Sequence, residues 1–362
     1  MKVGILTFPH SPSYGASLQM YALYKTVEQL GCTPFILNYQ NKYMQNKHHI
    51  EHNPIKAKLL NIVGYRTSKK FNQFEKMLTW LPKTIIHEAI KLHSVSAELE
   101  YIIVGSDQVW NPAVTGSDTA YFLDFCESKK KISYAASFGV NALEPQFAKV
   151  ITELLYDIPA LSIREQKGKE IIKKLTERDA SVVLDPTFLQ TKESWDKIVY
   201  AKPIVKQPYI FSFVFNSNEE NVSYKTRLSN ETGLPILSIS DNPMKKSDEK
   251  SIYVSGIGPK EFLRLIKDAE YIVTDSFHGT AFSIILNRPF YVSLSTKTNS
   301  RLETLLSTLE LENRIISECK TFNKHINYAK VNQSISVFRE RSLSFLQKAL
   351  FGVDNNEQKP NS

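Results

Sequence analysis

One short stretch of the chain, residues 274–280 with the sequence TDSFHGT, carries the clearest potential for chemistry. It places an imidazole, a carboxylate and several hydroxyls close together. A histidine and an aspartate can exchange protons with a substrate near neutral pH, and small polar residues leave room for an anion. The alternative interpretation is a polar turn in which Asp275 only caps the helix that follows.

The flanking segments indicate how this stretch is positioned. Residues 269–273 (AEYIV) are typical of a buried strand, and residues 281–287 (AFSIILN) are typical of a buried helix. The stretch therefore lies at the carboxyl end of a strand and the amino end of a helix. Ligands of open α/β sheets bind at such ends, and the helix N–H groups and dipole favour an anion there.

The start of the chain predicts a parallel sheet. A strand over residues 3–8, a polar loop over 9–17, a helix over 18–30 and a strand over 34–38 form a βαβ unit. The crossover of such a unit is right-handed and joins parallel strands. The loop lacks the GxGxxG spacing of dinucleotide-binding loops, which favours an active-site loop instead.

Two further strands are also expected to end in polar residues. The strand over residues 101–104 is followed by GSDQ, which contains Asp107, and the strand over 161–163 is followed by Arg164 and Glu165. These groups belong to the same sheet edge as the first loop. The alternatives are a turn-capping role for Asp107 and a surface ion pair for Arg164 with Glu165.

The strand and helix pattern recurs, which indicates two α/β domains. We assign residues 1–195 to the first domain and 205–305 to the second, with a helical tail over 306–362 that is disordered at its end. Near the end of the first domain, Asp185 and Pro186 are interpreted as a turn.

Charge is concentrated in one segment of the chain. The net charge is +8, and residues 40–95 alone contain ten Lys or Arg against three Glu. We expect a basic helical insertion here that attracts anionic partners such as phosphates or a membrane surface. The alternative is a solvated insertion without a partner, and no nucleic-acid motif accompanies the charge.

Composition sets the remaining bounds. Hydrophobic residues make up 42% and charged residues 23% of 362 positions, as in globular proteins. The chain has no bilayer-spanning apolar run, and its first residues, MKVGIL, lead directly into a strand. We therefore expect a cytoplasmic protein. Three widely spaced cysteines without a CxxC pair indicate no zinc site.

Four pieces of sequence, in this order, resemble the polysaccharide pyruvyl transferase family. They are the YGAxLQxYAL pattern after Ser13, the GSDQVWN segment at 105–111, SIRE at 162–165 with DPTFL downstream, and DSFHGT at 275–280 followed by Lys297 and Arg301. Members often have Asn where this chain has Ser13. The resemblance implies an α/β fold of two Rossmann-like domains facing a cleft, similar to glycosyltransferase B.

The resemblance also implies a reaction and a set of site residues. Pyruvate passes from phosphoenolpyruvate to two hydroxyls of a sugar as a ketal, in the biosynthesis of bacterial capsules or other surface polysaccharides. We expect catalysis by His278, Asp275 and Asp107, with Glu165 as a further candidate acid or base. The expected substrate-binding residues are Arg164, Lys297, Ser276, Gly279, Thr280, Arg301, Tyr14, Gly15 and Gln108.

No cofactor is expected: no nicotinamide, since the reaction moves no hydride, and no metal, since the sequence shows no cluster of metal ligands. The phosphoenolpyruvate site is assigned to the second domain, and the acceptor side to the first domain with its basic insertion. The acceptor can be a lipid-linked sugar at the inner face of the membrane. Such an acceptor implies peripheral membrane contact. One alternative function on the same fold is a nucleotide-sugar glycosyltransferase, and another is a glycan-binding protein without turnover.

Overall fold

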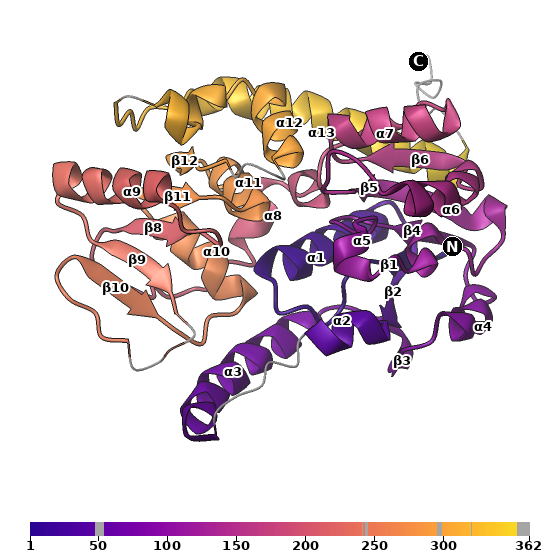
Figure 1. Ribbon diagram of the computed structural model, residues 1–362, viewed down its shortest axis with the longest axis horizontal. Helices are drawn as coiled ribbons and strands as arrows, with labels where there is room; N and C mark the ends of the chain where they lie inside the picture. Colours follow the sequence, from indigo (N-terminus) through magenta and orange to yellow (C-terminus); the bar gives the residue numbers. More distant parts are fainter. Residues whose placement is uncertain (48–53, 241, 243–244, 295–298, 320, 353–362) are drawn as a thin grey trace, which may run out of the picture.

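The computed structural model describes residues 1–47, 54–240, 242, 245–294, 299–319 and 321–352. It contains two α/β units, each built on a wholly parallel sheet (Figure 1). The first sheet has seven strands in the order β3-β2-β1-β4-β5-β6-β7, and the second has five in the order β10-β9-β8-β11-β12. The predicted α/β fold with parallel sheets is confirmed.

The strands of the first sheet are short and apolar. They are β1 (Lys2–Leu6), β2 (Thr33–Tyr39), β3 (Trp80–Ile86), β4 (Tyr101–Val104), β5 (Lys131–Ala136), β6 (Ala160–Ile163) and β7 (Ser181–Val182). The interior strand β5 is buried at every position, because helices cover both faces of a parallel sheet. The helices of this unit are α1 (Tyr14–Gln29), α2 (Lys42–Lys47), α3 (Pro54–Glu75), α4 (Leu92–Ser96), α5 (Pro112–Thr115), α6 (Pro145–Tyr156) and α7 (Gln166–Thr176).

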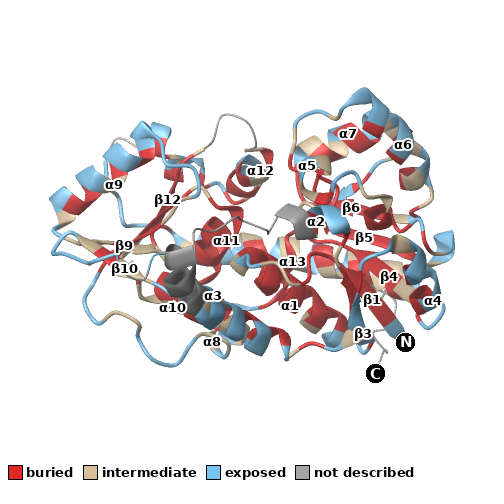
Figure 2. Cartoon of the chain, turned by 60° about the horizontal axis from the view of Figure 1, so that its bottom comes forward, coloured by how far each residue is buried: buried red, intermediate tan, exposed pale blue. Residues whose placement is uncertain are grey.

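The second sheet is smaller, and its strand β11 leads into the helix that contains His278. Its strands are β8 (Ile210–Phe213), β9 (Ile236–Ile239), β10 (Ser251–Val254), β11 (Tyr271–Thr274) and β12 (Phe290–Val292). Its helices are α9 (Glu219–Thr232), α10 (Pro259–Asp268), α11 (Phe277–Ile285) and α12 (Ser300–Thr308), and α8 (Lys192–Asp196) lies in the connection from the first unit. Every residue of α11 is buried (Figure 2).

The basic segment is only partly the helical insertion that we predicted. Helices α2 and α3 belong to it, but Trp80–Ile86 forms β3, the edge strand of the first sheet. The run WLPKTII pairs with β2 because its aromatic and β-branched residues suit a half-buried strand. The end of α3 reaches the second unit, where Lys70 forms an ion pair of 2.8 Å with Glu261 of α10.

The chain returns to the first unit at its end. Helix α13 (Tyr328–Phe351) packs beside the end of β7, where the Leu184 N–H donates to the Ser342 hydroxyl over 3.0 Å. Arg339 also donates to the carbonyl of Phe188 at 2.6 Å. The predicted tail contains the end of α12 and the long helix α13, with two short 3-10 helices between them (Glu312–Arg314 and Ile316–Glu318), while the prediction of disorder at 354–362 lies outside the described residues. Among the helices formed by described residues, none combines the length and apolarity that a bilayer crossing requires.

Candidate active site

The two sheets direct their carboxyl ends toward one another, and the polar ends of several strands meet there. Loops after β1 and β4 come from the first unit, and the loops after β8, β11 and β12 come from the second. They enclose a cleft of about 470 Å³. Eight of the predicted site residues line it, namely Tyr14, Gly15, Asp107, Gln108, Asp275, Ser276, His278 and Arg301.

Arg164 is buried behind this cleft and holds two carboxylates. Its side chain is 1% exposed, and its Nη1 donates to Asp185 Oδ2 at 2.7 Å while its Nη2 donates to Asp107 Oδ1 at 3.2 Å. The guanidinium also lies over the Phe277 ring, 4.4 Å from its centroid. The interpretation of Arg164 and Glu165 as a surface ion pair is therefore wrong.

Asp185 is the centre of this network, although its position in the sequence suggests only a turn. Its Oδ1 accepts from the Thr187 N–H at 3.0 Å, which is the expected turn contact. Its Oδ2 accepts from Arg164 and, at 3.0 Å, from the Ser106 hydroxyl. Burial alone would raise the pKa of Asp185, but the neighbouring His278 and Arg164 side chains and the Thr187 N–H hold that pKa far below its usual range.

His278 comes from the second unit and completes the network across the cleft. Its Nε2 lies 3.5 Å from Asp185 Oδ2, yet this buried nitrogen makes no hydrogen bond with any described residue. The other side of the ring faces Gly15 so closely that a Cβ there would lie 2.1 Å from His278 Nδ1. Glycine at position 15 is thus what permits the ring to occupy this place.

Helix α11 holds His278 in its first turn. Ser276 caps the helix by accepting from the Gly279 N–H at 3.2 Å, and Thr280 donates its hydroxyl to the Ser276 carbonyl at 3.0 Å. A Cβ at Gly279 would lie 2.6 Å from the Thr274 hydroxyl. Gly279 and Thr280 therefore build the helix start, and neither lines the cleft.

Asp107 and Asp275 have different surroundings in the cleft. Asp107 has φ +75° and accepts from its neighbour's N–H as well as from Arg164. Burial would raise the pKa of Asp107, but the charges of Arg164, His278 and Arg301 lower it below its usual value. Asp275 accepts the N–H groups of Phe215 and Asn216, both at 2.8 Å, and so fastens the loop after β8.

Two further charged groups complete the site. Arg301 is half-buried at the start of α12, and burial together with nearby Arg164 lowers its pKa to about 10. Glu165 is fully buried, and its Oε1 accepts from the Ser137 hydroxyl and the Phe138 N–H, both at 3.0 Å. Burial raises the pKa of Glu165 above its usual value. Lys297, also predicted to bind substrate, lies outside the described residues.

Sequence reasoning missed part of the network. Asp185 was assigned to a turn, and the roles of Ser106 and Gln19 were not anticipated. The Gln19 side chain accepts from the Ser106 N–H at 3.2 Å and so joins α1 to the loop after β4. The signal for Asp185 was its position shortly after β7, which ends at Val182. The described residues contain no group of three or more His, Cys, Asp or Glu arranged to hold a metal ion.

Solved structures show that this fold is shared with enzymes of the glycosyltransferase B type. A putative UDP-N-acetylglucosamine 2-epimerase from Listeria monocytogenes is 10% identical, with TM-score 0.57 over 100% of this chain and 99% of that chain. The S. aureus MnaA–UDP structure is 15% identical, with TM-score 0.54 over 100% and 99%. The UDP-GlcNAc 2-epimerase from Neisseria meningitidis is 11% identical, with TM-score 0.53 over 98% and 99%.

Comparison of the sequence itself gives the family. No curated protein matches the chain. A family model described as polysaccharide pyruvyl transferase matches residues 14–296, which include the cleft-lining residues after β4, β8 and β11. Because this match covers well over half of the sequence, the chain belongs to the polysaccharide pyruvyl transferase family.

Proposed function

We propose that this transferase moves pyruvate from phosphoenolpyruvate onto two hydroxyls of a sugar, forming a ketal and releasing phosphate. The observation that carries the proposal is the buried Nε2 of His278, which faces Asp185 without a hydrogen bond to a described residue and lies beside the cleft. A group in this state is suited to exchange a proton with a substrate.

The cleft also offers positive charge to a substrate that carries a carboxylate and a phosphate. Arg301 lines it, and its Nε is buried without a partner among the described residues. The first turn of α11 adds N–H groups and the positive end of its dipole. We propose that Arg164 keeps its bond to Asp185 and exchanges the longer bond to Asp107 for a substrate oxygen.

The proposed reaction then balances in protons. His278 delivers a proton to the methylene carbon of phosphoenolpyruvate, which becomes the methyl group, and the first sugar hydroxyl adds to C2. The C2–O bond to phosphate breaks and phosphate leaves with the bonding electrons, after which the second hydroxyl closes the ring. The two sugar hydroxyls lose one proton each. One of these protons restores the proton that His278 gave to the methylene carbon, and the other leaves with phosphate.

Asp107 suits the role of base in these steps. Its lowered pKa keeps it ionised at neutral pH, so it accepts rather than donates a proton. Asp275, whose oxygens are both held by backbone N–H groups, is better suited to position the loop after β8. No step needs a nicotinamide or another cofactor, because no hydride is transferred.

We further propose that the acceptor belongs to a bacterial capsular or other surface polysaccharide, or to its lipid-linked precursor. The described end of α3, which carries the exposed residues Arg66 and Lys69, lies beside the second unit near α10 (Figure 2). This charge supports peripheral contact at the cytoplasmic face of the membrane, since each such residue contributes roughly 1 kcal/mol near an anionic surface.

The test is acceptor-dependent release of phosphate. Purified protein is incubated with phosphoenolpyruvate and a galactose-containing acceptor, with His278→Gln and an acceptor-free reaction as controls. The proposal expects phosphate release only with acceptor and wild-type protein, together with the mass increase of a ketal in the product. Binding of a sugar nucleotide without any effect of phosphoenolpyruvate would instead support a glycosyltransferase, and acceptor binding without turnover would support a glycan-binding protein.

A further inference from the structure

A second cavity lies on the other side of Arg164, away from the cleft. It has a volume of about 580 Å³ and is bounded by the ends of β6 and β7, by α12 and by α13. Phe277 and Arg301 line both cavities, so the two adjoin. We call this second space the back cavity; the proposed reaction does not use it.

The back cavity is the more positive of the two. Among the described residues, its lining holds the three arginines Arg164, Arg301 and Arg341 against one carboxylate, Asp185, whereas the cleft has one arginine against two carboxylates. Asp185 is already occupied by its donors. Arg301 and Arg341 form no ion pair with any residue that the structure describes. An anion is therefore favoured here.

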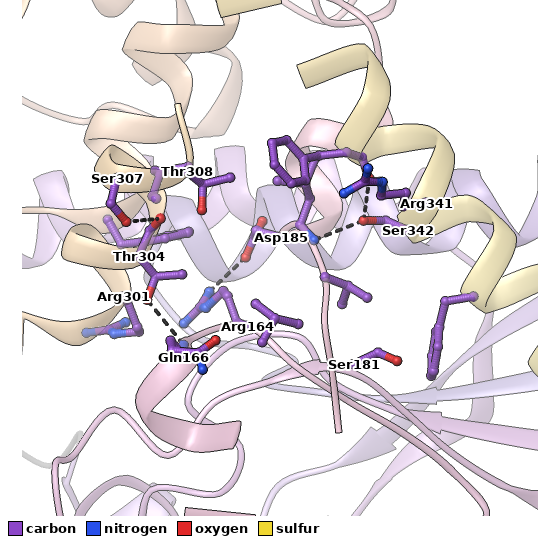
Figure 3. Close-up of a pocket in the computed structure, with 17 residues that line it drawn as sticks. Arg164, Gln166, Ser181, Asp185, Arg301, Thr304, Ser307, Thr308, Arg341 and Ser342 are labelled. Atoms are coloured by element: carbon purple, nitrogen blue, oxygen red, sulfur yellow. Dashed lines mark hydrogen bonds and ion pairs between the residues drawn. The ribbon is translucent and has the colours of Figure 1, made fainter. Parts of the chain in front are cut away.

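One end of the back cavity is polar. Arg164 and Arg301 lie close together there, next to the α12 hydroxyls of Thr304, Ser307 and Thr308 (Figure 3). The Nε atoms of both arginines are buried and make no hydrogen bond with the described residues. The Ser307 hydroxyl already donates to the Thr304 carbonyl at 3.2 Å. Unpartnered guanidinium N–H groups beside the hydroxyls of Thr304 and Thr308 match the oxygens of a phosphate group.

The opposite wall is formed by one face of α13 and is largely aromatic. Phe338, Arg341, Ser342 and Phe345 follow the spacing that puts side chains on one side of a helix, and all four line the cavity. Arg341 lies over the Phe338 ring at 5.5 Å from its centroid. This wall suits an apolar group rather than a second phosphate.

We propose that the back cavity is a second binding site that takes an organic phosphate ester. The phosphate lies at the end formed by Arg301 and the α12 hydroxyls, and the apolar part of the ester lies against Phe338 and Phe345. Arg301 belongs to both cavities, so a ligand in the back cavity competes for the same guanidinium that the cleft offers to its substrate.

The experiment measures binding of phenyl phosphate by calorimetry, with inorganic phosphate and neutral benzyl alcohol as comparison probes. Each titration is made with and without saturating phosphoenolpyruvate. We expect phenyl phosphate to bind more tightly than inorganic phosphate, and both to bind more weakly, but still measurably, while the cleft is filled, because Arg301 is shared. Benzyl alcohol should bind most weakly, because it lacks the charge.

Three variants that avoid the cleft locate the site. Thr308→Val should weaken both phosphates, whereas Phe338→Ala should weaken phenyl phosphate about tenfold and leave inorganic phosphate nearly unchanged, as loss of partial ring burial predicts. Val337→Ala, at an exposed neighbouring position of α13, is the matched control and should bind normally. Thermal unfolding of each variant checks that the fold is intact.

Two results would overturn the proposal. One is the absence of measurable binding to the wild-type protein. The other is binding whose affinity is unchanged in Thr308→Val and Phe338→Ala and which phosphoenolpyruvate abolishes. The probe would then occupy the cleft and not the back cavity. The titrations need no turnover, so a negative result here is separate from failure of the phosphate-release assay.

Discussion

The two units contribute opposite kinds of groups to the site. From the first unit, Arg164, Asp185 and Asp107 arrive already paired with one another and buried. From the second unit, His278 and Arg301 arrive with buried nitrogens that have no hydrogen-bond partner among the described residues. The first unit therefore contributes charges that are mostly paired, although the Nε of Arg164 also has no partner among the described residues, and the second unit contributes groups that a ligand can engage without breaking such pairs.

The largest expected effect is on turnover, and it comes from His278 in the second unit. Replacement by Ala or Gln should lower turnover with phosphoenolpyruvate by about 10²–10⁴-fold, the usual contribution of a positioned acid. Gln can donate a hydrogen bond but cannot deliver a proton, so the two variants separate the roles. Thermal unfolding of both should stay close to wild type. Near-normal turnover of His278→Gln would make His278 a hydrogen-bonding ligand and move the acid elsewhere.

Changes to the paired charges of the first unit should instead lower the stability of the fold. Asp185→Asn leaves Arg164 buried without its main counter-charge and should lower the free energy of unfolding at pH 7 by about 3 kcal/mol. Asp275→Asn is the control, because Asp275 is partly exposed and bound only to two backbone N–H groups, and it should cost about 1 kcal/mol. Urea unfolding measures both.

The pH dependence of Asp185→Asn gives a second check. The folded-state pKa of Asp185 is lowered, so its stabilisation is complete above the unfolded value of about 4 and is lost as the pH falls below it. The gap between wild type and Asp185→Asn should therefore narrow by about 1 kcal/mol from pH 7 to pH 3. An unchanged gap would mean that the carboxylate charge is not what holds the network.

The site residues of the second unit were easier to predict from the sequence than the paired charges of the first unit. His278 follows a strand and precedes a helix within one short stretch, so local patterns were enough to place it at the cleft. Asp185 meets Arg164 and Ser106 only through sheet packing, and a single sequence carries no record of such distant pairing. For the same reason the pairing of Trp80–Ile86 with β2 was missed inside a segment dominated by charge.

The contact between the two units can be broken at Gly15. A Cβ at this position would lie 2.1 Å from His278 Nδ1, so Gly15→Ala must displace the imidazole or separate the units. We expect turnover to fall about tenfold or more, with a loss of about 1–3 kcal/mol in unfolding free energy. Gly64→Ala, where no atom lies within 4 Å of the new Cβ, is the matched control and should be neutral or slightly stabilising. Full activity of Gly15→Ala would contradict the observed ring position.

The smallest expected effect is on the pH dependence of stability, and it comes from Glu165, another buried carboxyl group of the first unit. Its pKa is raised by burial, so from about pH 4.3 upward the unfolded chain loses this proton more readily than the folded one, and stability declines. Glu165→Gln can keep the Oε1 contacts to Ser137 and Phe138 but cannot ionise. Relative to wild type, it should therefore become more stable by about 1 kcal/mol between pH 4 and pH 7. Glu170→Gln, at an exposed position of α7, should show no such trend. If Glu165→Gln instead loses stability as the pH rises, the ionised carboxylate is part of the framework, and the first unit holds one more fixed charge than its contacts indicate.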